Sequence, residues 1–230
     1  NSTLGDQPFL LKLDNGKRLI YTLTNGEIYN FKELREKYGV ITQSNSDCEI
    51  IGHLYNQIGL SYVKELIGEF ATIIIDINDN NIKIHYIRDP FGVRPLFLSE
   101  SLDNLIMIAA SEIKSIQDIL NNYSPNELNI WHCDPGTIYS VIIDNNGGKL
   151  FTTYDSQRYY DNIYKYDTYM INETECLNMI KKMLKKSVIS MIEADRPLGA
   201  LLSGGLDSSL VCSIASSYLK KRGKRLDTFS

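Results

Sequence analysis

The residues best suited to chemistry form the run Ser-Gly-Gly-Leu-Asp-Ser-Ser at positions 203–209. A short apolar run precedes it, and apolar residues at helical spacing follow it. A turn between a strand and a helix exposes backbone N–H groups at the helix N-terminus, where hydrogen bonds and the helix dipole attract phosphate. The glycines let a ligand approach the backbone, and the serine hydroxyls add donors. The run therefore predicts a phosphate-binding loop without the Walker lysine; an ordinary glycine-rich connection is the alternative.

A second group of candidate residues is Asn-Gly-Glu-Ile-Tyr-Asn at positions 25–30. Taken alone, Asn25-Gly26 predicts a tight turn after a strand at Leu19–Leu23, because Asn-Gly is a favoured hairpin turn. Three further groups share the chain with it: Gln7-Pro8, Ser-Asp-Cys-Glu at 46–49 and Arg-Asp-Pro-Phe-Gly-Val-Arg-Pro-Leu at 88–96.

The Ser-Asp-Cys-Glu group predicts the start of a helix. Ser46 and Glu49 have capping-box spacing, so we expect a helix from Ser46 to Ile58, with one face formed by Ile50, Ile51, Leu54, Tyr55 and Ile58. Asp47 would then lie in the first turn, where the helix dipole favours an ionised carboxylate. Simple stabilisation of the helix start is the alternative role for Asp47.

Cysteine and histidine offer no site of their own. The cysteines lie far apart, form no CxxC pair and no zinc spacing, and are expected to be reduced thiols of a cytosolic protein: Cys48, Cys133, Cys176 and Cys212. Cys48 is expected near a helix N-terminus, where thiol pKa values are often lowered, but it is internal and we do not expect it to be a nucleophile. The histidines are isolated, and core or surface roles are expected for them: His53, His85 and His132.

The elements that must position these groups follow two patterns. Up to about Tyr154 the chain is strand-rich, with turn signals between β-branched runs. We expect a helix at Phe31–Tyr38 and a strand, turn and strand at Phe70–Ile77 and Ile82–Ile87. Leu96–Leu98 and Leu105–Ala109 are expected to continue the sheet, and Thr137–Ile143 and Lys149–Thr153 to form one more hairpin.

The second pattern begins after a Tyr- and Asp-rich stretch. Asn172 and Glu175 could cap a long helix, whose buried stripe would be Leu177, Ile180, Leu184, Val188 and Met191. A strand at Leu198–Leu202, the glycine-rich turn, a second helix and a strand at Leu226–Ser230 follow. This alternating order predicts a parallel α/β sheet.

Composition excludes several classes of protein. The 230 residues are 43% hydrophobic and 23% charged, with a net charge of −4 and no basic stripe, so we expect no nucleic-acid partner. We also expect no membrane partner, because no apolar run approaches the length of a bilayer span and the N-terminus has no signal pattern. The sequence begins at Asn1 without methionine and stops at Ser230 inside an expected strand, so we expect a longer protein around it.

The groups at 7–8, 25–30, 46–49 and 88–96, in this order, resemble class II glutamine amidotransferases, and the run at 203–209 resembles the pyrophosphate loop of adenylating ATP pyrophosphatases. The combination resembles the asparagine synthetase family over essentially the whole chain. The resemblance implies an α+β N-terminal-nucleophile-type αββα sandwich, followed by the start of an α/β ATP pyrophosphatase domain. The expected boundaries are 1–155 for the amidotransferase domain, 156–171 for a linker and 172–230 for the ATP domain.

The resemblance also implies roles for individual residues. Asn25 and Gly26 would form the oxyanion hole and, with Glu27 and Asp47, bind glutamine, the two carboxylates at its α-amino group. The 88–96 segment would shape this pocket. The nucleophilic cysteine and an arginine that holds the glutamine carboxylate would lie upstream of Asn1. The expected ATP contacts are Leu202, Ser203, Gly204, Gly205, Leu206, Asp207 and Ser208, and Asp207 would hold Mg²⁺ unless it only caps the helix.

The implied activity is a cytosolic, ATP-dependent synthesis of asparagine. Ammonia released from glutamine would attack aspartate activated as β-aspartyl-AMP, so glutamine, aspartate and ATP are the expected partners, with Mg²⁺ as cofactor and a homodimer left open. Two alternatives remain at this point: a related ligase with another acceptor, such as a β-lactam synthetase, and a nucleotide-binding homologue without catalysis.

Overall fold

The computed structural model describes residues 5–101, 107–120, 128–146, 149–160, 172–192 and 197–230. The chain divides into two compact units, Asn1–Ile163 and Tyr164–Ser230, and each is described by itself. The expected linker at 156–171 falls largely outside the described residues.

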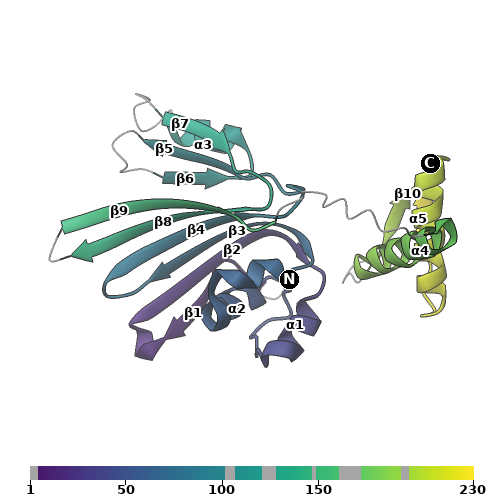
Figure 1. Ribbon diagram of the computed structural model, residues 1–230, viewed down its shortest axis with the longest axis horizontal. Helices are drawn as coiled ribbons and strands as arrows, with labels where there is room; N and C mark the ends of the chain where they lie inside the picture. The colour runs from purple at the N-terminus through teal and green to yellow at the C-terminus, as the bar shows by residue number, and fades with distance from the viewer. Residues whose placement is uncertain (1–4, 102–106, 121–127, 147–148, 161–171, 193–196) are drawn as a thin grey trace. The chain divides into compact units, whose positions relative to one another are not determined.

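The first unit is organised around a six-stranded antiparallel sheet in the order β1-β2-β3-β4-β8-β9 (Figure 1). Its strands are β1 (Phe9–Leu13), β2 (Arg18–Ile28), β3 (Gly68–Ile77), β4 (Asn81–Arg88), β8 (Thr137–Asn146) and β9 (Lys149–Arg158). The strands expected from β-branched runs are confirmed, and the turn at 78–81 closes through a hydrogen bond from Asn78 N to Asn81 O of 3.0 Å. Because β9 continues to Arg158, residues 156–158 belong to the sheet and not to the expected linker.

Two helices cover one face of this sheet, α1 (Phe31–Tyr38) and α2 (Ile50–Ile58), as Figure 1 shows. Between the strands and helices run two short 3-10 segments, Asp14–Gly16 and Gly59–Lys64. The predicted apolar face of α2 is confirmed, since Ile50, Ile51 and Leu54 are all 0% exposed in a core shared with β2 and β3. This core fixes α2, and with it the segment before α2, against the sheet.

A second, three-stranded antiparallel sheet lies on the other side, in the order β6-β5-β7. It consists of β5 (Phe97–Ser101), β6 (Met107–Ala110) and β7 (Leu128–His132), with α3 (Ile113–Leu120) against β6. The expectation that the strands near 96–109 continue the first sheet is therefore wrong. The segment after β4 carries the chain to a separate layer, and hydrophobic patterning predicts strands without specifying their partners.

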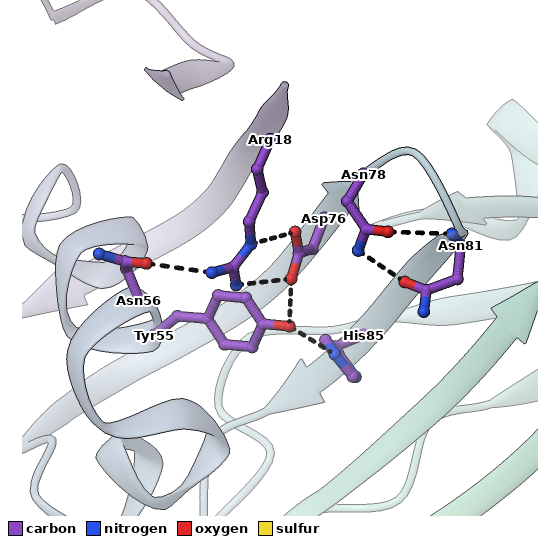
Figure 2. A network of polar contacts seen from close by, with 7 residues as sticks. All are labelled: Arg18, Tyr55, Asn56, Asp76, Asn78, Asn81 and His85. Atoms are coloured by element: carbon purple, nitrogen blue, oxygen red, sulfur yellow. Dashed lines mark hydrogen bonds and ion pairs between the residues drawn. The ribbon is translucent and has the colours of Figure 1, made fainter. Parts of the chain in front are cut away.

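A polar network fastens α2 to the first sheet (Figure 2). Asp76 on β3 accepts two hydrogen bonds of 2.9 Å from Arg18 and one of 3.0 Å from Tyr55 on α2. The Tyr55 oxygen lies 3.1 Å from His85 Nε2, and His85 Nδ1 lies 2.8 Å from Ser140 Oγ. Because Tyr55 gives its proton to Asp76, His85 must donate from Nε2 and accept from Ser140. His85 thus has the core role expected for it.

The second unit contains α4 (Glu173–Ser190), β10 (Gly199–Leu201), α5 (Leu206–Lys220) and β11 (Asp227–Phe229), and β10 pairs with β11 in parallel, as expected. The predicted cap of α4 is confirmed, because Asn172 Oδ1 accepts from Glu175 N at 2.9 Å. Among the described residues, no helix is long and apolar enough to cross a membrane.

The buried stripe predicted for α4 is only partly correct. Val188 is buried and Leu184 packs beside it against α5, but Leu177, Ile180 and Met191 are more than half exposed. Within the described part of this unit, only α5 and two short strands are present to cover α4, so most of the stripe lacks a neighbour.

Candidate functional site

Asn25 and Gly26 lie inside β2 and do not form the expected turn. β2 continues to Ile28, and its register places Asn25 opposite Ala71 and Gly26 opposite Phe70 on β3. Gly26 has a φ of 155°, and a Cβ atom there would lie 2.0 Å from the Glu69 carbonyl oxygen. A glycine is therefore required by the close approach of the two strands, a constraint that an Asn-Gly pair alone does not distinguish from a turn.

Beyond Thr22, where pairing with β1 ends, one backbone edge of β2 is occupied by side chains instead of a strand. Gln7 Oε1 accepts from Thr24 N at 2.5 Å, and Gln7 Nε2 donates to Thr24 O at 2.9 Å. Two positions further, Gly26 O accepts from the Cys48 thiol at 3.6 Å, and Asp47 Oδ2 accepts from Ile28 N at 2.6 Å. Alternate residues of a strand direct their backbone groups to the same side. The Gly26 N–H therefore faces this same edge, away from β3.

Asp47 reaches this edge from a turn and not from a helix, so the predicted helix start at Ser46 is wrong. α2 begins at Ile50, and Asp47 is three residues before it. The Glu49 carboxylate turns back to accept from Gln43 N and Ser44 N, both at 2.7 Å, instead of closing a capping box. The hydrogen bond from Ile28 N, not a helix dipole, is the stabilising contact for the Asp47 carboxylate.

The side chains of Asn25 and Glu27 are exposed on the face of β2 that looks toward the small sheet. Asn25 Nδ2 donates to Ser111 Oγ at 3.0 Å, and both residues line a cavity of about 280 Å³ together with Gln7 and Ala71. The four residues predicted for the glutamine site, Asn25, Gly26, Glu27 and Asp47, thus gather around one stretch of β2. Their roles remain predictions.

Cys48 has the surroundings of a structural thiol. Its side chain is 3% exposed, and burial, with Asp47 and Glu27 nearby, raises its thiol pKa far above the ordinary value. Burial likewise raises the pKa of Cys133 to about 12. All four cysteines are free.

The 88–96 segment is held by two buried charged residues at its start. Asp89, 0% exposed, accepts backbone N–H groups of Phe91, Val93 and Arg94, each at 3.0 Å. Arg88 donates to the carbonyl oxygens of Gly92, Arg94 and Cys133 at 2.7, 2.9 and 2.6 Å. These contacts fix the loop as a rigid turn and direct the Arg94 side chain to Glu69, at 2.6 Å.

Three contributors near the site were not predicted as site residues: Ser111, which bonds Asn25, and the pair Glu69 and Arg94. Arg94 belongs to the 88–96 motif, but the sequence alone does not show which residue it pairs with. The register that places Glu69 opposite Glu27 depends on β3 starting at Gly68. The polar residue at the start of this strand is the only sequence signal for that register.

In the second unit, the predicted loop lies between β10 and α5. Gly204 has a φ of 79°. Gly205 is the N-cap residue of α5, and no side chain caps the N–H groups of the first helical turn. Ser203 Oγ and Ser208 Oγ lie 3.0 Å apart across the loop. Asp207 is exposed inside the first helical turn, so it does not occupy the capping position. No cluster of three metal-binding side chains is found among the described residues.

Comparison with known families decides how this arrangement is classified. The model of the glutamine amidotransferase domain family matches residues 1–118, just over half of the 230 residues. This chain belongs to the glutamine amidotransferase domain family. The model of the asparagine synthase family matches residues 179–230, which include the loop before α5.

Three relatives of this amidotransferase-domain chain are named glutamine-hydrolyzing asparagine synthetases. The chain is 34% identical to a probable glutamine-hydrolyzing asparagine synthetase of Acanthamoeba polyphaga mimivirus over 95% of its length, and 34% and 35% identical to glutamine-hydrolyzing asparagine synthetases of Zea mays and Arabidopsis thaliana over 99%. The chain spans 39% of the viral relative's length and 36% of each plant relative's length.

A solved structure supports the expected fold. The amidotransferase-domain chain matches a glutamine phosphoribosylpyrophosphate amidotransferase from B. subtilis with a TM-score of 0.51 at 19% identity, over 96% of this chain and 48% of the other. At this identity the match concerns the fold alone. The expected N-terminal-nucleophile-type sandwich is confirmed.

Proposed function

We propose that this chain is part of a ligase that makes asparagine from aspartate, using ATP and ammonia released from glutamine. The observation that carries the proposal is the edge of β2, where the Gly26 N–H, the Asn25 amide and the Asp47 carboxylate lie around an exposed strand segment. The names of the relatives supply the acceptor, since they are asparagine synthetases.

For glutamine hydrolysis, the residues on β2 offer the groups that an acyl transfer needs. The Gly26 N–H and the Asn25 side-chain amide are donors for the oxygen of a tetrahedral intermediate, and loss of one such donor typically costs about 10²–10³ in rate. Glu27 and Asp47 would bind the substrate ammonium as charge-assisted partners. Cys48 is not assigned as the nucleophile, because it is buried and its thiol pKa is raised. In our proposal the nucleophile is the cysteine upstream of Asn1 that the family resemblance implies.

For the ligase step, the loop before α5 suits a polyphosphate. Its first-turn N–H groups have no side-chain cap, and Gly204 and Gly205 keep side chains away from them. We propose that Leu202–Ser208 contact ATP and that Asp207 helps to hold Mg²⁺, which would offset the charge of the phosphates. Activation as β-aspartyl-AMP would give the aspartate carboxylate a leaving group, which ammonia requires at neutral pH.

The proposal predicts separable effects of Asp47→Asn in the full-length protein. Asparagine retains an acceptor oxygen for Ile28 N, so the fold should persist while the charge is lost. Loss of one charge-assisted contact to the ligand ammonium should cost about 1.5–3 kcal/mol in kcat/KM for glutamine. Asparagine formation from added ammonium salt should stay near the wild-type rate. An equal loss with both nitrogen donors would refute the glutamine-site role of Asp47.

A further inference from the structure

Two glutamates face each other at the proposed glutamine site. The register of β2 and β3 pairs Glu27 directly with Glu69, on the same side of the sheet as Asn25. Like charges directly opposite each other on adjacent strands destabilise the pair. Asp47, held by the Ile28 N–H, adds a third carboxylate to the same end of β2.

Arg94 contacts this group of carboxylates as a cation. Its Nη2 lies 2.6 Å from Glu69 Oε1, with both side chains only about one third exposed, at 34% and 27%. The side chain of Tyr29 lies near the same charges. Burial, Glu69 and Glu27 raise its pKa, and Arg94 lowers it. Arg94 therefore neutralises one of two opposed carboxylates, and no ion pair to the other, Glu27, is found among the described residues.

The position of Arg94 is set by the turn that precedes it. Asp89 accepts from Arg94 N, and the Arg88 guanidinium donates to Arg94 O, so the backbone on both sides of the Arg94 Cα is fixed by buried groups. Arg94 Nε is buried and has no hydrogen-bond partner among the described residues. An unmet buried donor is unfavourable. The favourable ion pair to Glu69 therefore has to offset the cost of burying Nε without a partner.

We propose that Arg94 is a positioning residue that acts through Glu69: by occupying that carboxylate, it confines the substrate ammonium to Glu27 and Asp47. The inference rests on the proposed glutamine-hydrolysing function. Without Arg94, Glu69 becomes a competing carboxylate directly opposite Glu27, and an ammonium placed between the two would displace the substrate from the oxyanion donors of Asn25 and Gly26.

The test compares variants of the full-length protein in glutamine hydrolysis, measured as glutamate release. Arg94→Gln should lower kcat about tenfold with a smaller change in KM, because the ammonium is still bound but misplaced. Removing the competing charge as well, in Glu69→Gln/Arg94→Gln, should restore kcat to within about threefold of wild type. Arg94→Lys, which keeps a cation at Glu69, should retain most activity.

A matched control is Lys37→Gln, which removes the cation of another partly exposed ion pair, to Glu65, outside the site. It should leave kcat and KM unchanged, and melting temperatures will show whether each variant is folded. If Arg94 had only a structural role, Glu69→Gln would not restore kcat in the Arg94→Gln background. That result, or an Arg94→Gln variant with unchanged kcat, would overturn this inference but not the proposed function. A wild-type protein that releases no glutamate from glutamine would instead remove the proposed function, and this inference with it.

Discussion

At the scale of single residues, surroundings decide which side chains can do chemistry. Cys48 and Asp47 are neighbours in sequence, yet the thiol points into the core and donates to Gly26 O, whereas the carboxylate stays partly exposed at the edge of β2. A nucleophilic thiol needs a lowered pKa and access to substrate. Burial and two nearby carboxylates give Cys48 the opposite properties.

Substitution of Cys48 should therefore spare catalysis. In the full-length protein, Cys48→Ser should keep at least about half of the wild-type rate of glutamate release, because serine retains the donor to Gly26 O. Stability should fall by about 1 kcal/mol, since a hydroxyl is less favourable than a thiol in an apolar core. The measurement is glutaminase rate beside melting temperature. Inactivation of a folded variant would show that Cys48 takes part in the reaction.

At the scale of elements, local patterns predicted what each segment is, but not what lies beside it. The β-branched runs of β3 and β4, the apolar face of α2 and the Asn172 cap all depend on neighbours within a few residues, and all were predicted. The start of α2 was not, because Glu49 bonds the backbone of Gln43 and Ser44 instead of its own helix start. The membership of β5 and β6 in the second sheet was missed, because strand partners are set by distant contacts.

In the candidate site, too, the residue types could be predicted from local sequence, but their neighbours on other strands could not. Motif residues Asn25, Glu27 and Asp47 could be named from sequence, and the structure brings them to one stretch of β2. The role of Gly26 as a point of close strand approach, and the opposition of Glu27 and Glu69, depend on the register between β2 and β3. A one-residue change of register would move these side chains to the other face, and sequence patterning does not fix it to that accuracy.

The network that joins α2 to the sheet predicts how the stability of this chain depends on pH. Burial lowers the pKa of His85 to about 4, against an ordinary value of about 6.5. Between these values the unfolded chain binds a proton that the folded chain does not. The contribution of neutral His85 is therefore complete above about pH 6.5 and is lost as the pH falls toward 4. The pKa of Asp76 is lowered, because hydrogen bonds from Arg18 and Tyr55 outweigh burial, so its effect lies at still lower pH.

We expect the free energy of unfolding of the wild-type chain to fall between pH 7 and pH 5, with His85 contributing about 2 kcal/mol or less. His85→Gln should lower stability at pH 7 and make this fall shallower. Urea titrations at pH 5, 6 and 7, followed by the fluorescence of the single tryptophan, Trp131, would measure it. His53→Gln is the comparison: burial lowers the pKa of His53 as well, but His53 is less buried than His85, so its substitution should change the pH dependence less. An unchanged pH dependence in His85→Gln would contradict the lowered pKa.

At the scale of the whole molecule, the chain joins two units that match different families. The amidotransferase-domain match lies entirely in the first unit, and the asparagine synthase match lies entirely in the second. The candidate glutamine residues and the candidate ATP loop are thus on separate compact bodies. If the proposed function is correct, the two half-reactions should respond independently to substitutions at each site.

Asp207 offers the sharpest test of this separation. It is exposed in the first turn of α5, and the capping position belongs to Gly205, so its removal should leave the melting temperature nearly unchanged. In the full-length protein, Asp207→Ala should abolish aspartate-dependent pyrophosphate release, because an acidic group beside a polyphosphate is favourable only where a divalent cation lies between them. Glutamate release from glutamine should persist. Ser216→Ala, at an exposed position of α5 outside the 203–209 run, is a control for the helix. Near-normal pyrophosphate release by folded Asp207→Ala would remove Asp207 from the ATP site, and a parallel loss of glutaminase would show that the two units do not act independently.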